Sequence, residues 1–172
     1  TLETDRLILR EIYPNDTQAI FNGWMNDENV SRYMWWNASN DINDAKEFVE
    51  FELGNLENGK WNRWIIVLKS IPVIIGTCLI FFNEDEGHWD ISYNLGKKFW
   101  GNGYATEAMR TAMKYAVEEM NITEISTAYA AENRASGRVL QKLGFQFIRE
   151  VSYECNGGDI VTVGRYCSYK VG

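Results

Sequence analysis

The sequence has little of what metal sites, disulfide scaffolds and membrane anchors require. It contains one histidine, three cysteines and two prolines in 172 residues. A lone histidine without a Cys-x-x-Cys pair argues against a zinc site, and an odd number of cysteines argues against a disulfide framework. No apolar run approaches the roughly 20 residues that cross a bilayer, and no signal-peptide pattern is visible. We therefore expect a cytoplasmic protein with no bound metal and no membrane partner.

Positive charge is also scarce. Seventeen Lys and Arg residues against 24 Asp and Glu residues give a net charge of −7. Nucleic-acid binding needs a basic face, so we expect no nucleic-acid partner, whereas a cationic amine is a compatible one. The length and the ordinary composition, 45% hydrophobic and 24% charged, predict one domain over residues 1–172. The sequence leaves open whether that domain is a monomer or a homodimer.

Hydrophobic periodicity predicts an α+β fold in which helices cover the faces of a mixed sheet. The clearest helix is expected over 105–120, where apolar residues recur at the i, i+3, i+4, i+7 spacing of one buried face. The other expected elements are a strand over 2–10, helices beginning near 16 and 41, strands over 61–69, 73–82, 88–95 and 125–130, a helix over 135–143, and a hairpin of strands over 145–154 and 159–171.

The most informative local motif is Gly101-Asn102-Gly103, between the strand expected over 88–95 and the helix expected over 105–120. Two glycines one residue apart permit a backbone path that side chains would block. The free N–H groups at the start of the next helix, at the positive end of its dipole, suit a phosphate. A tight turn beside a solvated lysine pair is the competing interpretation. A dinucleotide fingerprint is excluded because Thr106 replaces its third glycine.

Two segments together, WGNGYATEA (100–108) and ENRASGRVLQKLGF (132–145), resemble the GNAT superfamily of N-acetyltransferases. The resemblance is to the RimJ/RimL branch, named for enzymes that acetylate the N-termini of ribosomal proteins. Residues 2–10 and 90–93 also match, so the resemblance spans nearly the whole chain. It implies the GNAT fold, an α+β fold with a mixed, mostly antiparallel seven-stranded sheet flanked by about four helices.

The resemblance implies that acetyl-CoA is the co-substrate and that a primary amine accepts its acetyl group. The loop pattern of the family falls on Trp100, Gly103 and Ala105, so the amides of 101–106 would hold the pyrophosphate. Leu95 would offer backbone groups to the pantetheine, and Asn133 matches the side chain that usually binds that arm. The expected cofactor contacts are Tyr93, Leu95, Lys98, Trp100, Gly101, Asn102, Gly103, Tyr104, Ala105, Thr106, Asn133 and Ser136.

The catalytic residues are less clear from the same resemblance. Many family members protonate the departing thiolate with a tyrosine seven residues after the asparagine, and Leu140 stands there in this sequence. Ser136 is the usual substitute in this branch; the alternative is that it only caps a helix. Asp90, on the strand before the glycine loop, is the expected general base. His88, on the same strand face, and Glu132 remain alternatives.

The acceptor is expected to be a small-molecule amine or a peptide N-terminus. Met34, Trp35 and Trp36 are candidate acceptor contacts, with a core cluster as the alternative role. Deprotonating a lysine-like amine at pH 7 costs about 4.6 kcal/mol, and an α-amine about 1 kcal/mol. This difference favours a peptide N-terminus or an amino-acid-like amine over a polyamine, and a buried carboxylate could reverse the preference. The alternative function is a catalytically silent module that binds acyl-CoA and regulates a partner.

Overall fold

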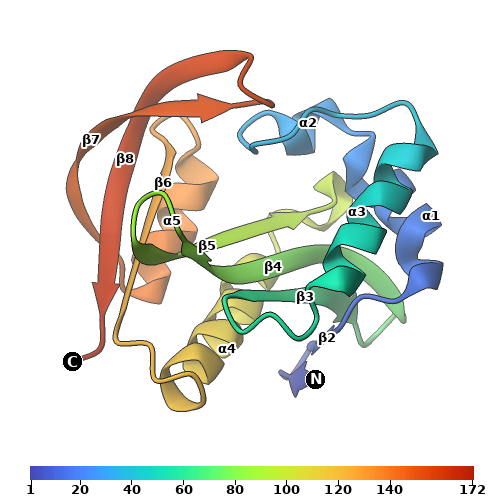
Figure 1. Ribbon diagram of the computed structural model, residues 1–172, viewed down its shortest axis with the longest axis horizontal. Helices are drawn as coiled ribbons and strands as arrows, with labels where there is room; N and C mark the ends of the chain where they lie inside the picture. Colours follow the sequence, from blue (N-terminus) through green and yellow to red (C-terminus); the bar gives the residue numbers. More distant parts are fainter.

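A computed structural model describes all residues, 1–172, and contains eight strands and five α-helices (Figure 1). In chain order they are β1 (Leu2–Glu3), β2 (Leu7–Arg10), α1 (Thr17–Ile20), α2 (Glu28–Ser31), α3 (Ile42–Gly54), β3 (Trp61–Leu68), β4 (Val73–Asn83), β5 (His88–Leu95), α4 (Tyr104–Glu118), β6 (Glu124–Ala130), α5 (Arg134–Leu143), β7 (Gln146–Cys155) and β8 (Ile160–Lys170). None of these helices is long and apolar enough to span a membrane.

The strands form two sheets, a five-stranded one in the order β1-β2-β3-β4-β5 and a three-stranded one in the order β6-β8-β7. Every paired strand is antiparallel to its neighbour. Between the sheets, β5 and β6 touch where the Thr127 Oγ1 donates to the Ile91 carbonyl at 3.4 Å. No ladder joins these two strands, so they diverge from that contact and leave room for a site.

The predicted fold class is confirmed, with two differences in the strands. The segment 2–10 folds into two antiparallel strands, because the chain reverses where the Thr4 N–H donates to the Leu7 carbonyl at 2.9 Å. The total is therefore eight strands instead of the seven expected. The sheets are also wholly antiparallel, where a mixed sheet was expected, because the one pair that could have run parallel, β5 and β6, has separated.

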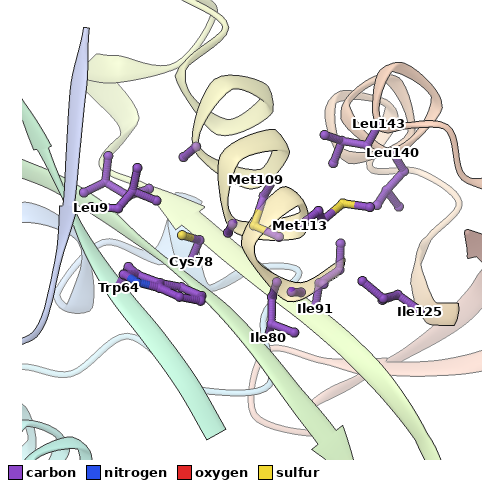
Figure 2. Packing of buried hydrophobic residues seen from close by; sticks show 14 of the residues in the cluster. Leu9, Trp64, Cys78, Ile80, Ile91, Met109, Met113, Ile125, Leu140 and Leu143 are labelled. Carbon is purple, nitrogen blue, oxygen red and sulfur yellow. The ribbon is translucent and has the colours of Figure 1, made fainter. Parts of the chain in front are cut away.

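The larger core lies between the five-stranded sheet and α4 and α5 (Figure 2). The helix pattern predicted over 105–120 is confirmed, since Met109 and Met113 of α4 are buried against the sheet. Figure 2 shows both methionines above Ile80 and Ile91 of the sheet, with Met113 on the side toward Leu140 of α5. This packing fixes the start of α4 against the end of β5, and the glycine loop lies between them.

The opposite face of the five-stranded sheet carries a smaller core under α1 and α3. The helix expected near 16 is broken into α1 and a π-helical turn over Phe21–Met25. The helix expected near 41 is confirmed as α3, whose N-cap Asp41 accepts a hydrogen bond from the Asn43 N–H at 2.9 Å. Trp36 packs against this smaller core.

A buried ion pair fastens α3 to the sheet. The Arg63 Nε lies 2.5 Å from the Glu52 Oε1, and these side chains are 10% and 3% exposed. The Trp61 Nε1 donates to the other Glu52 oxygen at 3.0 Å, and the Arg63 Nη1 donates to the Thr77 Oγ1 at 2.9 Å. Burial lowers the pKa of Arg63, although Glu52 opposes that change. The pair is thus held by neighbours that satisfy both charges.

Candidate active site

A cavity of about 860 Å³ opens where β5 and β6 diverge. Its walls come from α2 and the segment after it, from β5 and β6, from the loop before α4, from the first turns of α4 and α5, and from the end of β7. The volume is in the range of small-molecule and cofactor sites. The expected cofactor contacts that line it are Tyr93, Leu95, Trp100, Gly101, Gly103, Tyr104, Ala105, Thr106, Asn133 and Ser136.

Two expected cofactor contacts, Lys98 and Asn102, do not line this cavity. Lys98 is exposed, and its Nζ lies 5.1 Å from the centre of the Phe99 ring. The Asn102 side chain turns back and donates to the carbonyls of Phe99 and Trp100 at 3.2 and 3.1 Å. It therefore holds the shape of the loop, and neither side chain is a cavity contact.

The glycine loop has the backbone geometry that its sequence predicts. Gly101 and Gly103 lie in the left-handed region, with φ of +77° and +79°, where residues with a Cβ are disfavoured. A Cβ at Gly101 would meet nothing within 4 Å, and one at Gly103 would meet only Arg6 Nη2 at 3.6 Å. Gly103 is the N-cap of the 15-residue α4, whose first N–H groups lack helical partners. This open cradle fits a pyrophosphate.

The N-terminal segment holds this loop in place. The Arg6 Nη1 donates to the Asn102 carbonyl at 3.0 Å, and its Nε donates to Glu107 of α4 at 2.7 Å. The Thr4 hydroxyl donates to the other Glu107 oxygen at 2.5 Å. Burial opposes ionisation of Glu107, but these hydrogen bonds lower its pKa. The match of residues 2–10 to the family therefore has a physical role beside the loop.

Trp100 closes the loop onto β5. Its indole Nε1 donates to the Leu95 carbonyl at 2.9 Å. A carbonyl oxygen has two lone pairs, so Leu95 retains one for a ligand. The side chain of Trp100 thus binds the backbone of the protein itself. The free amides that could contact a ligand belong to the backbone of the loop.

Ser136 lies in the first turn of α5, beside a tyrosine of β5. Its Oγ is 2.7 Å from the Tyr93 hydroxyl. Burial raises the pKa of the Tyr93 phenol, even though Ser136 opposes this shift, so Tyr93 is protonated at neutral pH. The N-cap of α5 is Asn133, whose Oδ1 accepts from the Ser136 N–H at 3.2 Å. The N-cap of α5 is therefore Asn133 and not Ser136, and Ser136 is among the residues that line the cavity.

Among the three candidate bases, Asp90 has the most suitable surroundings. It lines the cavity, and burial raises the pKa of its carboxyl against the hydrogen bonds that it accepts. Glu132 also lines the cavity but is exposed. His88 does not line it, and its Nδ1 lies 3.0 Å from the Trp89 carbonyl. A raised pKa brings a carboxylate closer to the range in which it accepts a proton effectively near neutral pH.

The three candidate acceptor contacts are consecutive in the sequence but lie in different surroundings. Met34 and Trp35 line the cavity, and the Trp35 ring lies edge-on to Phe81 with centroids 5.5 Å apart. Trp36 does not line the cavity and packs against the smaller core, so the structure gives no support to its expected acceptor contact. The segment between α2 and α3 is irregular, so no periodicity of a strand or helix could predict which of these neighbours lines the cavity.

The tip of the β7–β8 hairpin reaches the same segment, at the top of Figure 1. The Tyr153 hydroxyl donates to the Tyr33 carbonyl at 3.1 Å, and the Asn37 Nδ2 donates to the Asn156 carbonyl at 2.8 Å. This contact brings Glu154 to the cavity wall. Sequence reasoning missed Tyr33 and Glu154, because the hydrogen bonds that position them join residues about 120 positions apart.

A family model described as "Acetyltransferase (GNAT) domain" matches residues 6–146. The chain belongs to the GNAT acetyltransferase family. As a GNAT acetyltransferase, it is an acetyl-CoA-dependent N-acyltransferase, and the predicted family and co-substrate are confirmed. It is 31% identical to the "Uncharacterized N-acetyltransferase p20" of Bacillus licheniformis over 85% of this chain and 82% of the relative.

Solved GNAT structures share the fold at lower identity. A GNAT acetyltransferase from Bacillus anthracis has a TM-score of 0.84 at 22% identity, covering 98% of this chain and 97% of that one. RimL, the ribosomal L7/L12 α-N-protein acetyltransferase, has a TM-score of 0.83 at 13% identity, covering 98% and 96%. The family match gives no support to a catalytically silent module. No group of three or more His, Cys, Asp or Glu side chains is arranged to hold a metal ion.

Proposed function

We propose that this GNAT acetyltransferase acetylates the α-amine of a peptide N-terminus or of an amino-acid-like small molecule. The observation that carries the proposal is one cavity that joins a phosphate cradle, at Gly101 and Gly103, to a hydroxyl pair, Tyr93 and Ser136. The cradle suits the pyrophosphate of acetyl-CoA, and a hydroxyl proton suits a departing thiolate.

Binding of acetyl-CoA would use backbone amides and positive side chains. The amides of 101–106 hold the pyrophosphate at the start of α4. The cap of α5 uses only the Oδ1 of Asn133, so its Nδ2 remains a donor for the pantetheine arm. Arg134, Arg138 and Lys142 line the same side of the cavity and add charge for the phosphates. Acetyl-CoA supplies the thioester.

Two residues divide the proton transfers. Asp90 removes a proton from the amine as the nitrogen attacks the thioester carbon. Ser136 gives its hydroxyl proton to the sulfur as the carbon–sulfur bond breaks, and the proton that Asp90 removed returns through solvent to the Ser136 oxygen. Tyr93 donates its own hydrogen bond to the Ser136 oxygen, which leaves the Ser136 proton directed into the cavity. Holding these groups together contributes through orientation as well as proton transfer.

The choice of an α-amine rests on charge and on pKa. The carboxylates of Asp90, Glu132 and Glu154 line the cavity, and they attract a cationic amine. Deprotonation at pH 7 costs about 1 kcal/mol for an α-amine and about 4.6 kcal/mol for a lysine-like amine. A single carboxylate base overcomes the smaller cost more readily. A protein α-amine is also the acceptor named for RimL. Trp35 and Met34 would contact the residue that carries this amine.

We also propose that residues 1–172 act as one domain in the cytoplasm, as a monomer or a homodimer. The three cysteines are free and buried, as expected of a reducing compartment.

Removing the Ser136 hydroxyl is expected to slow turnover without weakening acetyl-CoA binding. Ser136→Ala should lower kcat about 10–100-fold, or about 1.4–2.8 kcal/mol, with KM for acetyl-CoA within twofold. Tyr93→Phe should lower kcat by less. The double variant should be no slower than Ser136→Ala, because Tyr93 acts through Ser136. Steady-state thiol release with an alanine-initiated peptide measures all three.

The control for this series is Tyr115→Phe. Tyr115 is partly buried against Trp64, with ring centroids 5.7 Å apart, and lies outside the cavity. It should keep the wild-type kcat. A Ser136→Ala protein with wild-type kcat would remove Ser136 from the mechanism, and additive losses in the double variant would separate Tyr93 from Ser136.

A further inference from the structure

Asn94, near the end of β5, has a buried amide group without a partner. The residue is 9% exposed and lines the cavity. Its Nδ2 is the one buried side-chain nitrogen or oxygen in the chain that makes no hydrogen bond. Buried donors are nearly always paired, and an unpaired one costs about 1–3 kcal/mol. Such a donor beside a binding cavity points to a partner atom that a ligand brings.

The alternation of β5 separates Asn94 from the residues expected to contact acetyl-CoA. Tyr93 and Leu95 pack on the larger core beneath α4 and α5. Asn94 lies on the other face, as do Asp90 and Ser92, because successive strand side chains point to opposite faces. Opposite Asn94 on β4 is Thr77. The Thr77 hydroxyl oxygen accepts from Arg63 at 2.9 Å and makes no hydrogen bond with the Asn94 amide.

The face that carries Asn94 is the acceptor side of the cavity. Val30 of α2 and Trp35, after α2, line the cavity together with Asn94. Asp90, the proposed base, is on the same strand face and lines the same cavity. The Tyr93–Ser136 pair reaches the cavity from the opposite face of β5. An oxygen that pairs with Asn94 is therefore carried by the amine substrate and not by the thioester.

We propose that Asn94 selects amines that carry a carbonyl oxygen close to the amine, as a peptide N-terminus or an amino-acid amide does. Its Nδ2–H donates to that oxygen after a small rotation about χ2, a torsion that is soft in asparagine. A protonated polyamine offers only donors, so it leaves Asn94 unpaired. A site with a buried polar group discriminates against an analogue that cannot pair with it. This inference rests on the proposed acetyl transfer.

The test compares two acceptors of the same shape, alaninamide and 3-methyl-2-butanamine, which lacks the carbonyl. Asn94→Leu keeps the size of the side chain without its donor, and Asn94→Asp replaces the donor by oxygen. Each variant should lower kcat/KM for alaninamide 10–100-fold and change that for the carbonyl-free amine less than twofold. KM for acetyl-CoA should stay unchanged. The two amines differ in basicity, so kcat/KM of each variant is divided by the wild-type value for the same amine before the amines are compared.

Asn62→Leu is the matched control, since Asn62 is a partly buried strand asparagine outside the cavity. It should leave the ratio of the two amines unchanged. The inference would be overturned if Asn94→Leu lowered kcat/KM equally for both amines, or left it unchanged for alaninamide. Neither result would contradict the proposed acetyl transfer. If the wild type acetylated neither amine, acetyl transfer to these amines would fail. Calorimetry of alaninamide with the CoA-bound protein would then decide: equal affinity in wild type and Asn94→Leu overturns the role of Asn94, and a 10-fold or greater loss supports it.

Discussion

Gly103→Val is expected to weaken acetyl-CoA binding by at least about 100-fold, or about 2.8 kcal/mol. Gly103 has a φ of +79° and caps α4. A valine there is strained in the left-handed region, and its branched side chain occupies the space in which phosphate oxygens approach the backbone. Calorimetry with CoA measures the loss, and circular dichroism checks that the variant is folded.

Gly87→Val provides the control for backbone strain. Gly87 lies in the turn between β4 and β5 with a φ of +71°, and a Cβ there would meet nothing within 4 Å. Both variants should lose similar stability, because a left-handed conformation costs each about 1–2 kcal/mol. Only Gly103→Val should lose CoA binding. If Gly103→Val bound CoA with wild-type affinity, the loop would be a turn and not a cradle.

Glu52→Gln is expected to destabilise the fold by about 3–5 kcal/mol, because it leaves the buried Arg63 charge without a counter-charge. The variant keeps the shape of the side chain and an acceptor for Trp61, so the loss reports the charge itself. For a chain of this size the melting temperature should fall by about 6–20 °C. Urea unfolding followed by circular dichroism measures the free energy of unfolding.

An exposed ion pair gives the comparison. Lys60 and Glu84 are 2.7 Å apart, but their side chains are 59% and 68% exposed. Glu84→Gln should therefore leave the unfolding midpoint nearly unchanged. Adding Arg63→Met to Glu52→Gln should recover stability, because the unpaired charge is removed. A Glu52→Gln midpoint equal to the wild-type one would mean that water or other groups already neutralise Arg63.

Secondary structure was predicted best from the sequence where an element depends only on its own residues. The period of α4 depends on its own buried face, so its position was predicted to within two residues at each end. The division of residues 2–10 into two strands was missed, because the chain reverses at the hydrogen bond between the Thr4 N–H and the Leu7 carbonyl, and Glu107, 103 positions away, holds Thr4 there. Local periodicity carries no information about such a contact.

In the site, too, continuous motifs could be predicted from the sequence, whereas residues brought together from distant positions could not. The glycine loop and the Asn133–Ser136 turn are continuous motifs, so the sequence located both. Asn94 was missed because a single asparagine in a strand gives no signal until its partners are known. Trp35 and Trp36 were predicted as equals, yet only Trp35 lines the cavity, since the irregular segment that carries them has no period to read.

The central claim is acetyl transfer, and the mass of the acceptor tests it most directly. The protein is incubated with acetyl-CoA and an alanine-initiated peptide that contains no lysine, and free thiol is measured in the same samples. The account predicts one acetyl group on the peptide α-amine for each thiol released, at a rate well above that without protein. Binding of acetyl-CoA with no acetylated peptide and no thiol above background, for this peptide and for a panel of amines, would contradict it.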